Sequence, residues 1–86
     1  MKTNELKKGD WVVLANGWEA QIADNMKGNT RLATVYGFET EMGSVYSHDI
    51  LAKISGRFGQ PVAKIEYTPA QDFQRELSEA LFASLR

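Results

Sequence analysis

The stretch that decides the fold is Leu6-Lys-Lys-Gly-Asp-Trp-Val-Val-Leu-Ala-Asn-Gly-Trp-Glu-Ala-Gln-Ile-Ala23. Two short runs rich in strand-forming residues lie on either side of the dipeptide Asn16-Gly17. Asn-Gly favours a type I′ turn, which needs positive φ at both central residues and joins the strands of tight hairpins. We therefore expect an antiparallel hairpin that opens a small β-barrel, with Trp18, Ala20 and Ile22 on one face of its second strand.

The strand pattern continues downstream of this hairpin. Alternating polarity over residues 30–36 and 38–46 predicts a third and a fourth strand, with Gly43 as a bulge or sharp bend in the fourth. Residues 47–50 have the composition of a single helical turn, and residues 51–54 predict a short fifth strand. Residues 1–54 are thus expected to form a five-stranded, SH3-like antiparallel barrel.

The composition changes at residue 55. Two glycines and a proline over residues 55–61 indicate a loop, and residues 55–67 are expected to act as a hinge or extended connection, with a further short strand from residue 62 as the alternative. A C-terminal helix is expected over residues 68–86. Its start carries Thr68 as the cap, Pro69 at the first helical position and Gln71 at the third, which is a capping-box pattern.

This helix is predicted to be amphipathic. At about 100° per residue, Phe73, Leu77 and Leu81 fall on one face, while Phe82 lies about 180° from Phe73. Burial of three such side chains contributes about 1.5–3 kcal/mol each. We therefore expect this face to pack on the barrel or on a second copy of the chain as a homodimer, and Phe82 to contact solvent or a partner.

The composition of this chain excludes several kinds of site. The 86 residues, 43% of them apolar, are enough for one folded domain with a modest core. The absence of cysteine excludes disulfides, thiolate metal sites and thiol nucleophiles, and a single histidine argues against a histidine-rich metal site. No glycine pattern matches a phosphate-binding loop or a dinucleotide fingerprint, so no cofactor is expected.

Charge and hydropathy bear on partners and location. Ten basic and 11 acidic residues give a net charge of −1, unlike the strongly basic chains of many nucleic-acid-binding proteins. No run of eighteen apolar residues exists, and the first residues lack the apolar segment of a secretion signal. We therefore expect a cytoplasmic protein that does not enter a membrane.

Two polar patterns invite a catalytic interpretation. Ser47-His48-Asp49 contains the residue types of a catalytic triad, but consecutive side chains diverge, so His48 is expected instead as a contact residue on the barrel rim. Glu39 and Glu41 lie two residues apart in a predicted strand and share one face. We expect them to form an acidic strip that meets a basic partner, and we do not expect an enzyme; a small hydrolase is only the third hypothesis.

Aromatic residues are the better candidates for binding. Trp11, Trp18, Tyr36, Phe38, Tyr46 and Phe58 exceed what one small core is expected to hold, although Trp11, Trp18 and Tyr46 also suit a core. Trp18, Phe38 and Phe58 are predicted to contact a protein partner from the rim and loops. In the alternative function, nucleic-acid binding, phosphate contacts are expected from Lys7, Lys8, Lys27 and Arg31, which lie near two predicted turns.

The chain resembles SH3-like and KOW-type barrels over residues 6–54. The resemblance rests on residues 6–14, on Asn16-Gly17-Trp18-Glu-Ala20, and on the Ser47–Ile50 turn before the last predicted strand. It implies protein or RNA binding in the transcription and translation machinery, and the short chain also looks like a phage or plasmid accessory protein. The leading hypothesis is a non-catalytic module that binds a protein partner.

Overall fold

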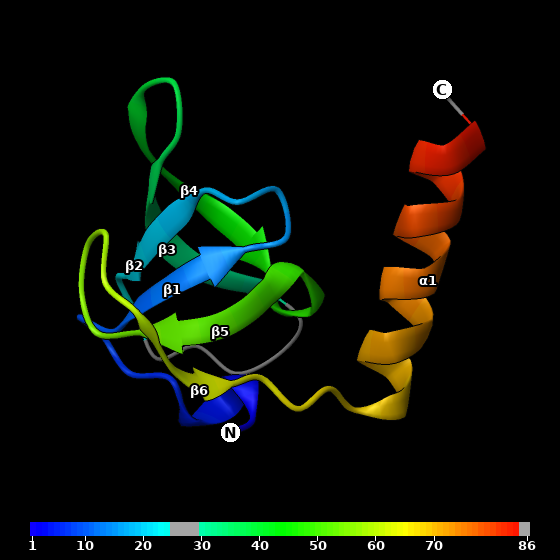
Figure 1. Cartoon of the computed structure of the whole chain (residues 1–86), viewed down its shortest axis with the longest axis horizontal. Helices are drawn as coiled ribbons and strands as arrows, with labels where there is room; N and C mark the ends of the chain where they lie inside the picture. Colours follow the sequence, from blue (N-terminus) through cyan, green and yellow to red (C-terminus); the bar gives the residue numbers. More distant parts are fainter. Residues whose placement is uncertain (25–29, 85–86) are drawn as a thin grey trace.

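The structure is a computed structural model that describes residues 1–24 and 30–84, apart from the side chain of Phe82. It is mainly β with one C-terminal helix, as expected. Six strands form one curved antiparallel sheet in the order β4-β3-β2-β1-β5-β6, and α1 stands beside it (Figure 1). The elements are η1 (Thr3–Glu5), β1 (Trp11–Leu14), β2 (Glu19–Ile22), β3 (Thr30–Tyr36), β4 (Thr40–Tyr46), η2 (Ser47–Asp49), β5 (Ile50–Ile54), β6 (Pro61–Lys64) and α1 (Pro69–Ser84).

The sheet differs from the expected five-stranded barrel. A sixth strand, β6, pairs with β5 through Ala52 and Lys64, so residues 55–67 contain a strand of the sheet. Strands β4 and β6 form its two ends, and no pairing between them closes a barrel in the described part of the chain. The glycine-rich loop before β6 turns the chain back beside β5, where Pro61 occupies the first residue of an edge strand, a position that proline tolerates.

The β1–β2 hairpin is confirmed, but the predicted turn type is wrong. The amide of Leu14 donates to the carbonyl of Trp18 at 2.7 Å, and the amide of Gly17 donates to the carbonyl of Leu14 at 2.9 Å. The loop between the strands therefore has three residues, 15–17. Positive φ occurs at Gly17, at 88°, and not at Asn16. The Asn16 side chain instead accepts from the Trp18 amide at 3.0 Å, so Asn16 serves as a turn residue through its carboxamide.

The expected bulge at Gly43 is also absent. Strands β3 and β4 pair in unbroken register from Thr30↔Tyr46 to Tyr36↔Thr40, with Gly43 opposite Ala33. Glycine permits a bulge without requiring one. The irregularities lie instead on the two sides of β5, between Val13 and Leu14 of β1 and between Lys53 and Ile54.

The core lies on the inner face of the curved sheet. Strands β1 and β2 each alternate between buried and half-buried residues, and Ala20 and Ile22 share the buried face of β2 as expected. The expectation that Trp18 shares this face is wrong: Trp18 precedes β2, where the alternation of the strand does not apply, and it lies exposed on the other face beside Glu19 and Tyr36. Leu6 enters the core from the segment after η1, and Ile65 enters it directly after β6. The buried apolar cluster comprises Leu6, Val12, Leu14, Ala20, Ile22, Ala33, Ile50 and Ile65.

One arginine is buried on this inner face. Arg31 of β3 donates to the carbonyl of Thr3 at 2.6 Å, of Leu6 at 2.8 Å and of Asp24 at 2.9 Å. Its Nε also lies 3.8 Å from the Asp24 carboxylate, close enough for an ion pair but too far for a hydrogen bond. Arg31 therefore fixes the N-terminal segment and the end of β2 to the sheet.

Helix α1 starts as the sequence predicts. The Thr68 amide donates to Gln71 Oε1 at 3.0 Å, and the Gln71 amide donates to Thr68 Oγ1 at 3.2 Å, so the capping box is confirmed. Gln71 Nε2 also donates to Thr3 Oγ1 at 3.3 Å, and the Arg75 guanidinium donates to the carbonyl of His48 at 3.0 Å. These polar contacts attach the first half of α1 to η1 and η2.

The apolar face of α1 does not pack on the sheet, contrary to one of its two expected roles. Phe73, Leu77 and Leu81 are 57%, 44% and 65% exposed. The polar contacts of Gln71 and Arg75 turn another side of the helix toward the body. Packing of this face on a second copy stays a prediction, as does a partner contact of Phe82, whose side chain lies outside the described part.

Tyr67 links the helix start to the sheet. Its hydroxyl is expected to make the folded state less stable at alkaline pH. Its hydroxyl donates to the carbonyl of Ile50. Burial raises the pKa of Tyr67 above its usual 10.0, although the nearby Arg75 opposes this effect. An unfolded chain therefore loses this proton at lower pH than the folded chain, and stability must fall as the pH rises above the unfolded pKa.

Comparison with Tyr67→Phe tests this dependence. The wild type is expected to be more stable than the variant by about 0.5–1.5 kcal/mol at neutral pH, because the variant lacks the hydrogen bond. This advantage should shrink as the pH passes 10.0, the usual pKa of the side chain. Urea unfolding of both proteins from neutral to strongly alkaline pH measures it, and an advantage that stays constant or grows would contradict the prediction.

Candidate functional site

Aromatic side chains gather on the outer face of the sheet, opposite the core. We call Trp11, Trp18, Tyr36, Phe38 and Phe58 the outer aromatic surface. The rings of Trp11 and Tyr36 lie 5.1 Å apart, and those of Trp18 and Phe38 meet edge to face at 5.5 Å. Phe38 and Phe58 are 97% and 81% exposed. Residues from β1, β3 and three connecting loops thus form one surface.

Arg57 joins two of these rings. Its guanidinium carbon lies 4.3 Å from the ring centre of Tyr36 and 5.0 Å from that of Phe58. Both distances are within the range of cation–π attraction, which contributes about 0.5–1 kcal/mol at exposed sites. Arg57 therefore orders the surface and adds a cation to it.

A shallow pocket of about 340 Å³ lies within the outer aromatic surface. Its walls include Trp18, Tyr36 and Phe58. Ile54 also lines it and is buried, although it does not belong to the inner core cluster. The outer face thus has an apolar layer of its own, with a hollow in which a partner's side chain can be buried.

The backbone of Phe58 is held in an unusual conformation. Phe58 has a φ of 60°, the left-handed region, which costs a residue with a Cβ on the order of 1–2 kcal/mol. Its amide donates to both carboxylate oxygens of Glu19, at 3.0 and 2.9 Å. Strained backbone of this kind concentrates at functional sites, and here it presents an exposed ring.

Gly37 is needed for the position of Trp18. A Cβ added at residue 37 would lie 2.5 Å from two carbons of the Trp18 ring, closer than Cβ atoms occur in proteins. The indole therefore packs directly on the glycine backbone, a close approach that only glycine allows. The β3–β4 hairpin thus supplies Phe38 as a neighbour and Gly37 as a support for Trp18.

The structure brings together three of the predicted contact residues, Trp18, Phe38 and Phe58. Glu39 and Glu41 are exposed next to Phe38 on the same hairpin. His48, however, is only 5% exposed and stacks on the Tyr46 ring at 5.0 Å. The expectation that His48 offers a contact on the rim is therefore wrong, because η2 turns its ring inward.

The alternative basic site is not assembled as expected. Arg31 is buried and bonded to three carbonyls, so it cannot contact phosphate without breaking the fold. Lys7 and Lys8 are exposed in the turn before β1. Lys27 lies outside the described residues. The alternation of β3 could have predicted the burial of Arg31, because it places this residue on the same face as Ala33.

Two members of the outer aromatic surface, and Arg57 beside it, were missing from the predicted contact set. Tyr36 has the same parity as Thr34 in β3, opposite to the buried Ala33, which indicates the outer face. Trp11 likewise alternates with the buried Val12. No sequence pattern predicted the position of Arg57, apart from its place next to Phe58 in a glycine-rich loop.

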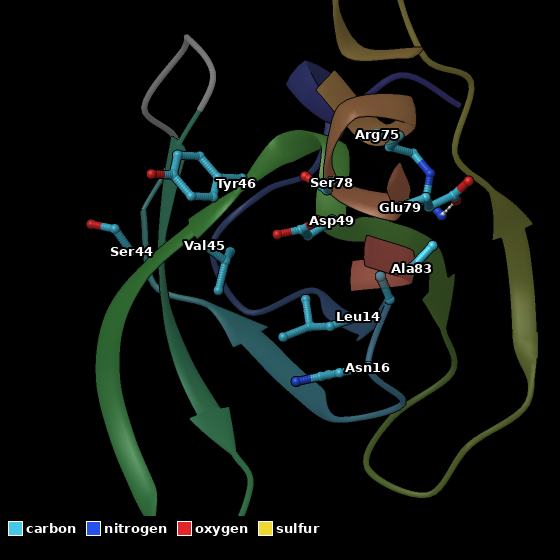
Figure 2. Close-up of a pocket in the computed structure, with 11 residues that line it drawn as sticks. Leu14, Asn16, Ser44, Val45, Tyr46, Asp49, Arg75, Ser78, Glu79 and Ala83 are labelled. Carbon is cyan, nitrogen blue, oxygen red and sulfur yellow. Dashed lines mark hydrogen bonds and ion pairs between the residues drawn. The ribbon is translucent and has the colours of Figure 1, made fainter. Parts of the chain in front are cut away.

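A second concavity lies between the sheet and α1 (Figure 2). This groove has a volume of about 610 Å³ and is bounded by β4, η2, the β1–β2 turn and α1. Leu14 and Val45 supply apolar walls, while Asp49, Arg75 and Glu79 supply charged groups. Figure 2 shows Arg75 and Glu79 joined on the helix side; their side chains are 3.1 Å apart.

Ser47, His48 and Asp49 are not arranged as a catalytic triad. Nδ1 of the buried His48 has no hydrogen-bond partner, and Nε2 lies 4.0 Å from the Asp49 carboxylate, so the ring is not oriented as the base of a triad is. Over residues 1–24 and 30–84, no three or more acidic or histidine side chains are placed to share a metal ion.

Within the same ranges, no helix combines the length and apolarity needed to cross a membrane.

Comparisons of the chain with models of protein families, with curated proteins and with solved structures found no match.

Proposed function

We propose that this chain is a non-catalytic module that binds a protein partner through the outer aromatic surface. The observation that carries the proposal is a pair of exposed rings: Phe58 lines a pocket with Trp18 and Tyr36, and Phe38 packs edge to face on Trp18. Tryptophan, tyrosine and arginine are enriched among residues that dominate binding energy at interfaces. All three types occur here within one connected surface.

Charge supports a protein partner over a nucleic acid. Glu39 and Glu41 are exposed beside Phe38, and Glu19 lines the pocket. These carboxylates repel phosphate and attract basic side chains of a protein. The burial of Arg31 removes one of the four cations of the nucleic-acid alternative. The proposed partner therefore offers apolar side chains for the pocket and basic residues around them.

An SH3-like relationship is part of the same proposal. Strand β1 pairs with both β2 and β5, and the turn η2 directly precedes β5. Both features support the resemblance seen over residues 6–54. Such small β domains present loops and outer faces as binding surfaces, which agrees with a module that recognises another protein.

Affinity capture with a matched control tests the proposed surface. Immobilised wild type, the double variant Phe38→Ser/Phe58→Ser and the control Phe73→Ser are each incubated with a lysate of the source cells. Proteins enriched on the wild type should fall at least about tenfold on the double variant and persist on the control, because loss of a central aromatic contact costs about 2 kcal/mol or more. Equal capture by all three would contradict the proposal.

Single-stranded DNA tests the nucleic-acid alternative separately. A labelled oligonucleotide is titrated with the protein at low ionic strength, and polarisation is measured. We expect no saturable binding, because no basic patch accompanies the aromatic rings in the part of the chain that the structure describes. Binding that weakens steeply with salt and is lost in Phe38→Ser/Phe58→Ser would assign the surface to nucleic acid instead.

Gly37→Ala perturbs the same surface without removing a contact side chain. The added methyl group overlaps the Trp18 ring and should displace the indole from its place beside Phe38. We expect weaker capture of the same partners with little loss of global stability, since the collision is on the outer face. Capture and urea unfolding together measure this; unchanged capture would show that the position of Trp18 does not matter.

A further inference from the structure

The two edge strands of the sheet differ in how readily they can pair with a strand from another chain. Strand β6 has four residues and carries Pro61 and Lys64, two features that discourage pairing with another strand. Strand β4 has seven residues, Thr40–Tyr46, contains neither proline nor lysine, and pairs on one side with β3. Among residues 1–24 and 30–84, no strand pairs with its other side.

The groove beside α1 follows this unpaired edge. Ser44, Val45 and Tyr46 all line it. Successive side chains of a strand point to opposite faces, so three consecutive lining residues place the groove along the edge of β4. Figure 2 shows Val45 directed toward the groove and α1 on its far side. The volume of about 610 Å³ lies in the range of ligand pockets.

The walls of the groove favour an apolar and cationic occupant. Leu14 and Val45 form an apolar part. The carboxylates of Asp49 and Glu79 are both substantially exposed, at 41% and 67% of their side chains. Arg75, the one cation among the described residues of the lining, already donates to His48 and Glu79. The charge left for an occupant is therefore negative.

We propose that this groove is a second binding site, separate from the outer aromatic surface, that takes an extended peptide as an additional strand on β4. Main-chain hydrogen bonds to β4 supply affinity, as in other cases of strand addition. Alternate side chains of the peptide point toward Leu14 and Val45 and are apolar. Lysine or arginine side chains at the remaining positions lie near Asp49 and Glu79.

Three synthetic pentapeptides, blocked at both ends, probe the site. The first alternates lysine and valine, the second replaces its lysines by glutamate, and the third replaces its valines by proline. Binding to the isotope-labelled full chain is followed by amide chemical shifts. The lysine–valine peptide should shift the amides of Ser44, Val45 and Tyr46 with saturation, and should slow the hydrogen exchange of alternate β4 amides. The other two peptides should not, because one reverses the charge and the other cannot pair.

Matched variants distinguish the effect of carboxylates in the groove on peptide binding from the effect of the net charge of the protein. Asp49→Asn/Glu79→Gln should bind the lysine–valine peptide about fivefold more weakly, since each replacement removes one exposed and therefore weak ion pair with the peptide. Glu66→Gln/Glu76→Gln removes the same charge from exposed positions outside the groove lining and should bind it unchanged. Phe38→Ser/Phe58→Ser should also bind it unchanged, so failure of the proposed protein-binding surface leaves this result intact.

Several results would overturn the proposal. Absence of saturable shifts at β4 with the lysine–valine peptide would do so, as would equal binding of the proline peptide. Shifts confined to Trp18 and Phe58 would place the peptide on the outer aromatic surface instead. Concentration-dependent shifts of β4 amides without peptide, together with a dimeric mass, would show that a second copy of the chain occupies the edge.

Discussion

Replacement of Arg31 by methionine is expected to lower the free energy of unfolding by about 3–5 kcal/mol, the cost of breaking a buried charged network. Methionine fills a similar space but donates no hydrogen bond. The carbonyls of Thr3, Leu6 and Asp24 then lose the guanidinium as a donor, and the Thr3 carbonyl keeps its bond from the Leu6 amide. The ion pair between Arg31 and the Asp24 carboxylate is also lost. A domain of this size is stable by only about 5–15 kcal/mol, so the variant should be close to unfolding.

Urea unfolding followed by circular dichroism measures this effect, with Arg57→Met as the matched control. Arg57 is exposed, and its loss removes only cation–π contacts of about 0.5–1 kcal/mol. Arg31→Lys should fall between the two, because one ammonium group cannot reach three carbonyls in the guanidinium's geometry. If Arg31→Met costs less than about 1 kcal/mol, the buried network described here does not stabilise the fold.

The second large effect is expected for Ile50→Ala, at about 2–5 kcal/mol. Ile50 is fully buried at the start of β5, where η2 delivers the chain to the core. Truncation removes apolar contacts and leaves a cavity among side chains of several strands. Ile50→Val, which deletes one methyl group, should cost about 0.5–1.5 kcal/mol.

Leu77→Ala is the informative counterpart on α1. Leu77 is the least exposed member of the apolar stripe but still does not belong to the core. Alanine has a higher helix propensity than leucine, so we expect a change within about 0.5 kcal/mol. Thermal or urea unfolding at two protein concentrations measures the stability of Ile50→Ala and Leu77→Ala against the wild type. A loss for Leu77→Ala that grows with protein concentration would show that the stripe is buried against a second copy.

Local rules predicted much of the fold correctly because they depend on neighbouring residues. Alternation put Ala20 and Ile22 on one face, which the structure buries, although it wrongly added Trp18 to that face. The Thr68–Gln71 pattern located the helix start to the residue. The turn at Gly17 shows the limit of such rules. Asn16 has two ways to stabilise a turn, through positive φ or through its carboxamide, and the sequence does not choose between them.

The orientation of α1 and the state of Arg31 depend on distant residues. Gln71 binds Thr3, which is 68 positions away, and Arg31 binds the same residue 28 positions away. No periodicity within either segment reports such a contact. The helical wheel identified the apolar stripe correctly but not its direction, which the polar anchors at η1 and η2 determine. For the candidate site, composition pointed to aromatic residues, and only the fold shows that Arg57 and Tyr36 join them.

Both tryptophans of this chain lie on the outer face of the sheet and not in the core. Their intrinsic fluorescence therefore monitors the outer aromatic surface directly. Quenching by acrylamide should be substantial in the native protein and should decrease when a partner covers the indoles. Unlabelled protein is then sufficient for equilibrium titrations, and the same emission is a poor measure of whether the core has formed.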